Sequence, residues 1–414
     1  MNILFVTKSL PYPPNAGFKK RTYHLIKGLS KDNRVSVICS GNYEQEKANV
    51  EALKECTHSI TLIPSTQRHS RILNLFSPLP FNIKRWNSLL IKKAIEQIIK
   101  KEQIDLILCD SIYQAGNIPS NSCYKVLAEH NIESVIIRRY AETENNIAKR
   151  TYAFAELRKM RNYENRMWPE FDLCLVCSEE DKKIIQSRIS KQSVEVVPNG
   201  VDIEYFKPLE LIRDAERGMR NEDGSPHPAP RKPHNENNSL VYTGEIGWHP
   251  NKDAIIYFAR EIWPLIKKEV KDVLFYVVGN NPPDEIKKLS EKDTSIIVTG
   301  FVEDIREYIG KASVFVTPLR IGSGTRLKIL EAMAMGKPVV STSIGCEGIE
   351  VTNGENIIVA DKPAEFKDKV IELFNNQQLK TSLSISARKL IEERYSWGKI
   401  TQKLNNIISG LKII

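Results

Sequence analysis

The sequence feature that most constrains the fold is the segment 313–342, SVFVTPLRIGSGTRLKILEAMAMGKPVVST. Its hydrophobic pattern predicts a buried strand over Val314–Thr317, a glycine-containing loop, a helix from about Thr325 to Gly336 and a second strand over 339–342. Short β-branched runs on both sides of a helix are typical of parallel strands that are covered by helices. The segment therefore predicts a βαβ unit and, with it, an α/β fold.

The loop of this unit is a candidate phosphate site. It consists of Gly322, Ser323, Gly324 and Thr325. Such a loop lies at the carboxyl ends of the strands, where open α/β sheets bind ligands. A turn that leads into a helix offers unpaired backbone N–H groups and the positive end of the helix dipole. Arg326 and Lys328 add two cations in the first turn, where they oppose the dipole unless an anion is bound.

Glu331 follows Lys328 by three residues, so the two side chains share one face of the helix. Facing a ligand, this carboxylate can accept two hydrogen bonds from the cis-diol of a ribose while the basic pair holds a diphosphate. The alternative is an ordinary ion pair on a solvated helix. The two glycines, the two cations and the flanking strands together favour a nucleotide site.

The same residues resemble the signature of the retaining, GT-B-fold glycosyltransferases of family four, the group 1 glycosyl transferases, which use nucleotide sugars. The family pattern has a Glu, seven residues and a second Glu before Ala-Met-Ala-x-Gly-x-Pro-Val-Val. The second Glu corresponds to Glu331, but Ser323 occupies the position of the first, which in the family approaches the donor sugar. Either the loop backbone replaces that acid or the chain handles its sugar differently.

The resemblance implies two Rossmann-like domains that face each other across a cleft, with a C-terminal helix that crosses back to the first domain. The length of 414 residues is sufficient for two such domains. The expected parts are an acceptor-side domain (1–208, with the helix 397–414), a linker or insertion (209–238) and a nucleotide-sugar domain (239–396). Residues 211–238 have almost no large apolar groups and predict a flexible insertion.

The net charge of +9 implies attraction to an anion such as a nucleotide, a membrane surface or a nucleic acid. Nucleic acid is disfavoured, because the basic residues are scattered without interleaved aromatic stacking positions. No apolar run reaches the ~20 residues of a membrane span. The opening apolar run is too short for a signal peptide, so we expect a cytoplasmic protein.

A metal or other cofactor is not expected. The seven cysteines indicate free thiols, and the lone Cys174-x-x-Cys177 pair lies in a predicted strand without a second pair or a matching histidine. No Asp-x-Asp pair suggests a bound metal either. The donor substrate itself, a nucleoside-diphosphate sugar, is the only small molecule that the sequence implies.

A basic amphipathic segment at 82–101 admits two interpretations. Apolar residues recur at helical spacing at Ile83, Trp86, Leu90, Ala94 and Ile98, and lysines and arginines lie between them. Such a helix can lie on an anionic membrane as a peripheral contact on the inner face of the cell membrane. The sheet-covering alternative is favoured, because every α/β domain requires such helices.

His130 follows a predicted strand that ends at Ala128, where a ligand cleft is expected. It resembles the family histidine in a His-Asn-x-Glu context, which contacts the transferred sugar. We therefore predict that His130 contacts the donor sugar or the acceptor rather than acting as a strict general base. Gly17, in the loop after the first strand, is a further donor-binding candidate, although a simple turn glycine is equally compatible with the sequence.

The remaining candidates lie in turns that the family also uses. They are Asn199 and Gly200, which are expected to line the interdomain cleft, Gly244 in the turn after a strand that ends at Thr243, and Gly300 and Val302 beside the nucleobase. Many family members place an Arg and a Lys near Gly244 to hold the diphosphate. This chain lacks that pair, so Arg326 and Lys328 are expected to do most of that work.

These observations predict a retaining transfer of a sugar from a nucleoside-diphosphate sugar to a glycan or lipid-linked acceptor, without a metal, in surface polysaccharide biosynthesis. Cations and helix N–H groups would stabilise the charge that develops on the leaving diphosphate. Two alternatives stay open. One is a nucleotide-sugar epimerase on the same fold, and the other is a non-catalytic nucleotide-sugar-binding protein.

Overall fold

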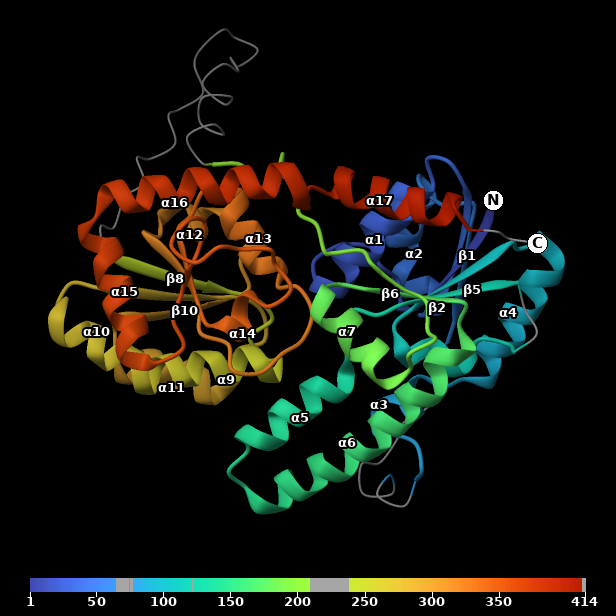
Figure 1. The fold of residues 1–414 in the computed structure, drawn as a ribbon, viewed down its shortest axis with the longest axis horizontal. Coiled ribbons are helices and arrows are strands. Elements are labelled where there is room, and N and C mark those ends of the chain that lie inside the picture. The colour runs from blue at the N-terminus through green and yellow to red at the C-terminus, as the bar shows by residue number, and fades with distance from the viewer. Residues whose placement is uncertain (65–73, 75–76, 121–122, 209–237, 412–414) are drawn as a thin grey trace, which may run out of the picture. The chain divides into compact units, whose positions relative to one another are not determined.

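The computed structural model describes residues 1–64, 74, 77–120, 123–208 and 238–411. The chain divides into two compact units, Met1–Asn199 with Trp397–Ile414 and Gly200–Ser396. Each unit contains one parallel sheet with helices, so the predicted α/β class is confirmed (Figure 1). The predicted insertion at 209–238 lies, apart from Asn238, outside the described residues. None of the described helices is both long and apolar enough to cross a membrane.

The first unit has a seven-stranded sheet in the order β3-β2-β1-β4-β5-β6-β7. Its strands are β1 (Asn2–Ser9), β2 (Arg34–Ser40), β3 (Ser59–Ile63), β4 (Leu106–Asp110), β5 (Tyr124–Ala128), β6 (Leu173–Val176) and β7 (Val194–Val196). The central strands β1 and β4 are buried on both faces, as expected for parallel strands that helices cover. The strand order reverses between β1 and β4, and ligands of open α/β sheets bind outside the carboxyl ends at such a point.

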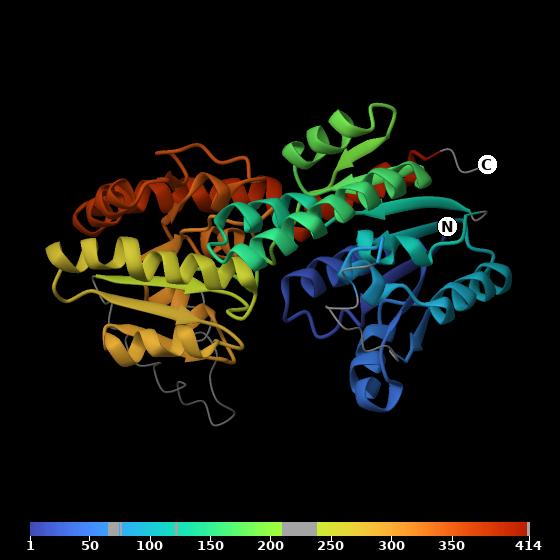
Figure 2. The same ribbon diagram turned by 90° about the horizontal axis from the view of Figure 1, so that it is seen from below.

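The helices of the first unit connect these strands. They are α1 (Gly17–Leu29), α2 (Tyr43–Lys54), α3 (Phe81–Trp86), α4 (Leu89–Glu102), the 3-10 turns η2 (Ile112–Asn117) and η3 (Trp168–Glu170), α5 (Glu133–Thr143), α6 (Ile147–Met167) and α7 (Glu179–Arg188). Figures 1 and 2 show α5 and α6 side by side as a long antiparallel pair. The last helix, α17 (Trp397–Ser409), returns to this unit and packs on α1. The ring of Trp397 stacks on that of His24, with 4.6 Å between the centroids.

The basic segment 82–101 forms two helices instead of one, because the chain bends at Asn87 and Ser88 caps the start of α4. The bend changes which residues face the core. Ile91 and Ile95 are buried in the core of the unit, so α4 covers the sheet. The prediction that Leu90 belongs to the apolar inner face is wrong, since its side chain is 53% exposed.

The second unit has a six-stranded sheet in the order β10-β9-β8-β11-β12-β13. Its strands are β8 (Ser239–Thr243), β9 (Leu274–Val278), β10 (Ile296–Gly300), β11 (Val314–Thr317), β12 (Val339–Ser341) and β13 (Ile358–Val359). Its helices are α9 (His249–Tyr257), η4 (Phe258–Ile262), α10 (Trp263–Glu269), α11 (Asp284–Lys292), α12 (Arg306–Lys311), α13 (Leu327–Ala334), α14 (Ser343–Cys346), α15 (Pro363–Asn375), α16 (Gln377–Leu390) and η5 (Ile391–Tyr395). The reversal of strand order falls between β8 and β11.

The predicted βαβ unit is β11-α13-β12, and its strands pair in parallel. The helix starts at Leu327, two residues later than predicted, because Arg326 is the N-cap residue with extended backbone angles (φ −87°, ψ 101°). All but the first two residues of α13 are buried, and most of them pack in an apolar cluster with β11 and β12. The segment therefore fixes the loop before α13 at the point where the strand order reverses.

Candidate active site

Lys328 is the central side chain at the reversal point of the second unit. From the first turn of α13, it reaches the carboxyl end of β8. Its Nζ donates a hydrogen bond to Asn251 Oδ1 at 2.9 Å. The same ammonium lies over the ring of Tyr242, 3.9 Å from the centroid, which is a favourable cation–π contact. The structure thus brings a cation from β11-α13 onto the end of the neighbouring strand.

Gly244 lies directly against this lysine. A Cβ atom at residue 244 would lie 2.8 Å from Lys328 Nζ and 3.0 Å from Asn251 Nδ2. The backbone angle φ of +149° also favours glycine. Two residues that the sequence analysis selected from separate motifs, Gly244 and Lys328, are therefore in close contact.

Asn251 and Tyr242 were missed by the sequence analysis. Asn251 Oδ1 also accepts a hydrogen bond from the Tyr242 hydroxyl at 2.7 Å, and its Nδ2 donates to the carbonyl of Glu245 at 2.7 Å. Asn251 is buried in the first turn of α9, and Tyr242 is buried in β8. An asparagine just after a glycine turn was the signal that could have found it. The two side chains hold Lys328 in one position.

The electrostatics of Lys328 favour an anionic ligand. Burial lowers the pKa of Lys328 well below its ordinary value of 10.5, the Arg326 charge lowers it further, and Glu331 opposes the shift. An anion placed beside the ammonium would raise this pKa again, because it stabilises the charged form. The helix N-terminus adds to the same preference.

The side chain of Arg326 folds back onto the loop that precedes α13. Its guanidinium is buried, with 6% exposure, and its Nη1 donates to the carbonyls of Ser323 and Gly324. Gly322 allows this arrangement, since a Cβ there would collide with the guanidinium. Thr325 donates from its hydroxyl to the carbonyl of Gly348 at 3.3 Å. The structure therefore holds Arg326 against loop carbonyls, whereas Lys328 extends to the end of β8.

Glu331 is also buried, with 5% exposure, on the buried part of α13. The alternative of an ion pair on a solvated helix is therefore excluded. Gly300 ends β10 and its carbonyl accepts from the backbone N–H of Gly279, at the end of β9, at 3.1 Å. Val302 is half-buried beside the same strands. The candidates Gly244, Gly300 and Val302 thus lie at or just after the carboxyl ends of β8 and β10, which belong to one sheet.

The first unit has a second polar cluster at its own reversal point. His130 Nε2 lies 2.6 Å from Asp110 Oδ1, and Asp110 is the last residue of β4. The other carboxylate oxygen, Oδ2, accepts hydrogen bonds from the hydroxyls of Thr7 at 2.9 Å and Thr22 at 2.7 Å. The sequence analysis found His130 but missed Asp110, although an acid at the end of a buried strand was a usable signal.

Glu133 and Lys8 lie in the same cluster. Burial raises the pKa of Glu133 to about 7, while hydrogen bonds from Tyr113 and Asn131 and the charge of Lys8 oppose the shift. Burial lowers the pKa of Lys8, which Asp110 and Glu133 counteract. The cluster thus combines one ionised carboxylate with a carboxyl group that titrates near neutrality.

Glu129, which precedes His130, has a structural role. Its two carboxyl oxygens accept from Trp168 Nε1 at 2.9 Å and from the backbone N–H of Ile112 at 3.2 Å. The neighbouring helix α5 is fixed by Glu164, which accepts from the backbone N–H of Ser134 at 2.8 Å and from Arg188 Nη1 at 2.8 Å. These buried bonds hold the turn that carries His130.

The other candidates in this part of the chain occupy connecting segments. Gly17 is the first residue of α1. Arg21 of the same helix donates from Nη1 to Asn199 Oδ1 at 3.0 Å and to the carbonyl of Pro198 at 2.9 Å. Asn199 therefore belongs to the first unit, and Gly200 begins the second. Their predicted place in a cleft stays a prediction.

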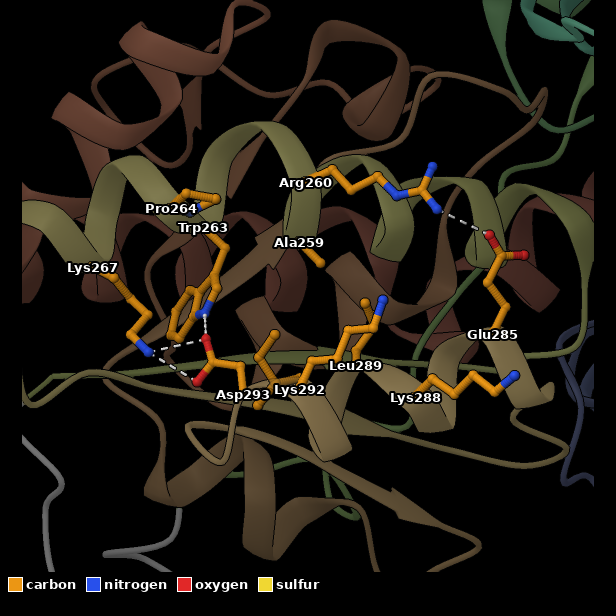
Figure 3. A pocket seen from close by; sticks show the side chains of 11 residues that line it. Ala259, Arg260, Trp263, Pro264, Lys267, Glu285, Lys288, Leu289, Lys292 and Asp293 are labelled. Carbon is orange, nitrogen blue, oxygen red and sulfur yellow. Dashed lines mark hydrogen bonds and ion pairs between the residues drawn. The ribbon is translucent and has the colours of Figure 1, made fainter.

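A separate groove lies between α10 and α11 on the outside of the second unit (Figure 3). Two of its cations, Lys267 and Arg260, are paired with carboxylates. Lys267 Nζ and Trp263 Nε1 both donate to the carboxylate of Asp293, and Arg260 donates to Glu285. Asp293 and Ile296 lie at the amino end of β10, away from the carboxyl ends that carry Gly244 and Lys328. The groove is therefore not part of the candidate site.

Two parallel sheets covered by helices match the architecture of the GT-B glycosyltransferases. The structure resembles that of sucrose-phosphate synthase from Thermosynechococcus elongatus with a TM-score of 0.73 and 13% identity, over 99% of this chain and 98% of the other. The chain has the GT-B fold.

The family follows from the sequence models. Residues 16–205 match the model described as Glycosyltransferase Family 4, and residues 237–376 match Glycosyl transferases group 1. The chain therefore belongs to the group 1 glycosyltransferases of family 4, and the predicted resemblance is confirmed.

Two relatives span different shares of the chain. An uncharacterized 44.6 kDa protein in the cps region of Klebsiella pneumoniae is 24% identical over 96% of this chain and 97% of its own length. The Escherichia coli UDP-Gal:alpha-D-GlcNAc-diphosphoundecaprenol alpha-1,3-galactosyltransferase is 28% identical over 48% of this chain. The match covers 47% of that enzyme, so the chain aligns with about half of its length.

Proposed function

We propose that the protein transfers a sugar from a nucleoside-diphosphate sugar to a glycan or lipid-linked acceptor, with retention of the anomeric configuration, in the synthesis of a surface polysaccharide. The observation that carries the proposal is the Lys328 ammonium, held by Asn251 and Tyr242 at the reversal point of the second sheet. The Escherichia coli relative, which is named for a UDP-sugar donor and a lipid diphosphate acceptor, supports it.

The chemistry requires that negative charge on the leaving diphosphate be stabilised. As the bond between the sugar and the β-phosphate breaks, charge develops on the phosphate oxygens. Lys328, whose pKa is lowered by burial, becomes fully protonated beside that charge. Arg326, in the loop before α13, adds a second cation, and the first N–H groups of α13 add donors. With these groups in place, we propose that the transfer requires no metal.

Glu331 and the first unit complete the proposed roles. The buried Glu331 carboxylate would accept hydrogen bonds from the ribose hydroxyls, while Gly300 and Val302 would lie beside the base. His130 would contact the transferred sugar or the acceptor. Because Ser323 replaces the first acid of the family pattern, the donor sugar would meet the loop backbone and a hydroxyl group at that position.

The test measures release of nucleoside diphosphate from a panel of nucleotide sugars, with and without lipid-linked acceptors. We expect Arg326→Ala and Lys328→Ala each to reduce turnover on the order of 100-fold or more, the usual effect of losing one electrostatic donor. Lys287→Ala is the control, because this lysine is an exposed surface residue of α11 that pairs with Asp284. Near-normal turnover in both site variants would refute the assignment. A chelator should leave the rate unchanged.

The same assay separates two other functions. A nucleotide-sugar epimerase would change the sugar of the donor when no acceptor is present, so the product is analysed after incubation of the donor alone. A non-catalytic binding protein is the second candidate, and the uncharged Ser323 favours it. Such a protein would bind nucleotide sugar, as thermal shift would show, but would neither hydrolyse nor transfer it.

We also propose a peripheral contact between the segment 82–101 and an anionic membrane. Leu89 and Leu90 are exposed by 78% and 53%, and Lys92 and Lys93 follow them at the start of α4. Exposed apolar residues beside lysines are typical of interfacial helices. The protein should sediment with vesicles that contain phosphatidylglycerol and not with pure phosphatidylcholine, and Leu89→Ser with Leu90→Ser should weaken this binding. Unchanged sedimentation of the double variant would contradict the contact.

A further inference from the structure

We infer that Asp110 is a positioning residue for sugar transfer, which acts by holding the ring of His130 in one orientation and one protonation pattern. The inference rests on the proposed function of His130 as a contact of the sugar or the acceptor. Asp110 ends β4, and its parallel neighbour in β5 is Ala128, two residues before His130. The register of the two strands therefore brings the carboxylate and the imidazole to the same edge of the sheet, at a distance of 2.6 Å.

The carboxylate itself is held by three elements. Thr7 from β1 and Thr22 from α1 both donate to Oδ2, while His130 Nε2 meets Oδ1. The residue is 2% exposed, so water does not compete for these bonds. When both oxygens of a carboxylate are hydrogen-bonded to groups from different elements, the carboxylate cannot rotate. The imidazole that contacts it is therefore fixed in the plane that Asp110 sets.

The charge of Asp110 decides which ring nitrogen of His130 carries hydrogen. Burial alone would raise the pKa of Asp110, but the electrostatic interaction and hydrogen bond with His130 and the bonds from Thr22 and Thr7 outweigh it and keep that pKa below 3.8. An ionised carboxylate only accepts hydrogen bonds, so Nε2 of His130 must be the donor. The second partner of a histidine commonly sets its tautomer in this way.

A purely structural carboxylate is the alternative, because Asp110 also ties β1 and α1 together. Asp110→Asn separates the two roles. The amide has the same shape, its oxygen still accepts one bond, and its nitrogen can donate to a threonine hydroxyl. The substitution removes the charge that requires a hydrogen on Nε2. A structural role would therefore change stability, whereas a positioning role would change turnover through His130.

The experiment measures kcat and KM for Asp110→Asn, His130→Ala and the double variant, with the nucleotide sugar and the lipid-linked acceptor from the panel above that give the highest rate with the native protein. We expect Asp110→Asn to lower kcat roughly 10-fold to 100-fold, the range for a misplaced catalytic contact, with the KM for the donor unchanged. In the His130→Ala background the same substitution should have no further effect on kcat. The control is Asp105→Asn, at the opposite end of β4, whose carboxylate accepts from the backbone N–H of Asn2 at 2.7 Å. It should leave kcat unchanged.

A nitrogen-15 NMR spectrum of the histidine rings gives a readout that does not depend on activity. The native protein should show hydrogen on Nε2 of His130, and Asp110→Asn should change that pattern. Normal kcat in Asp110→Asn, or additive losses in the double variant, would overturn the inference. Native protein that shows the Nε2 pattern but no transfer would instead refute the proposed function. If Asp110→Asn does not fold, Thr7→Val replaces it, because this variant removes one hydrogen bond to Asp110. Thr7→Val should lower kcat in the native background and have no effect in the His130→Ala background. An unchanged kcat in the native background would overturn the inference.

Discussion

Gly244→Ala tests whether the position of the Lys328 ammonium controls binding of a nucleoside diphosphate. The added methyl group would lie 2.8 Å from Nζ and 3.4 Å from Cε of this lysine. To restore an ordinary contact of 3.4 Å, the ammonium must retreat by about 0.6 Å. Its hydrogen bond to Asn251, now 2.9 Å, is then stretched or lost, and the cation is displaced from its position at the end of β8.

Two costs follow from this geometry. An alanine at a φ of +149° is strained by about 1–3 kcal/mol, which lowers the free energy of unfolding. The misplaced ammonium should lose about 1.5 kcal/mol of its interaction with the diphosphate, the lower end for a hydrogen bond to a charged group. That loss corresponds to a Kd for the nucleoside diphosphate that is roughly 10-fold higher.

Calorimetry with free nucleoside diphosphates measures the Kd, and urea unfolding measures the stability. Gly354→Ala is the matched control, because its φ is +81° and no atom lies within 4 Å of an added Cβ. It should lower stability by a similar amount and leave the Kd unchanged. Equal Kd values for Gly244→Ala and Gly354→Ala would refute the role of Lys328. If both values were raised above that of the native protein, backbone strain alone would explain the weaker binding.

Two further predictions concern buried acids. Glu331→Ala should raise the Kd for nucleoside diphosphates about 10-fold by removing a charged acceptor of ribose hydroxyls, and calorimetry that gives an unchanged Kd would contradict this role. Burial raises the pKa of Glu133 from 4.5 to about 7, so the folded protein binds this proton more tightly than the unfolded chain and loses stability as the pH rises through that range. Glu133→Gln should reduce this pH-dependent fall in the free energy of unfolding by about 1–3 kcal/mol. Urea unfolding at several pH values measures it, and a free energy of unfolding that depends on pH in the same way in both proteins would exclude the effect.

The fold could be predicted because its signals are local. The β-branched runs of β11 and β12 and the apolar pattern between them define a βαβ unit without knowledge of any other segment. Boundaries were less accurate where a side chain makes a longer contact. Arg326 was placed inside the helix, but its guanidinium binds the carbonyls of Ser323 and Gly324 and its backbone is extended. The bend before α4 likewise turned Leu90 outward, which the single-helix pattern could not indicate.

The candidate site could be predicted only in part, because its contacts depend on which strands are neighbours. Lys328 and His130 were found from motifs. Their partners Asn251 and Asp110 were not, since Asn251 meets Lys328 only because β8 pairs with β11, and Asp110 meets His130 only because β4 pairs with β5. Strand order is a property of the whole sheet and cannot be read from one segment. Asp110, the polar residue that ends the buried strand β4, was nevertheless visible in the sequence.

The two clusters differ in charge, and this difference assigns them different ligands. In the second unit, Lys328 has a pKa lowered by burial and by a neighbouring arginine, so an entering anion relieves an unfavourable arrangement. In the first unit, Asp110 is ionised, Glu133 titrates near neutrality and Lys8 offsets them, so the cluster gives an anion little advantage. Its carboxylate and imidazole instead suit hydroxyl groups, which both donate and accept. Under the proposed function, the same topological position would hold a diphosphate in one unit and sugar hydroxyls in the other, as a transferase with a nucleotide-sugar donor requires.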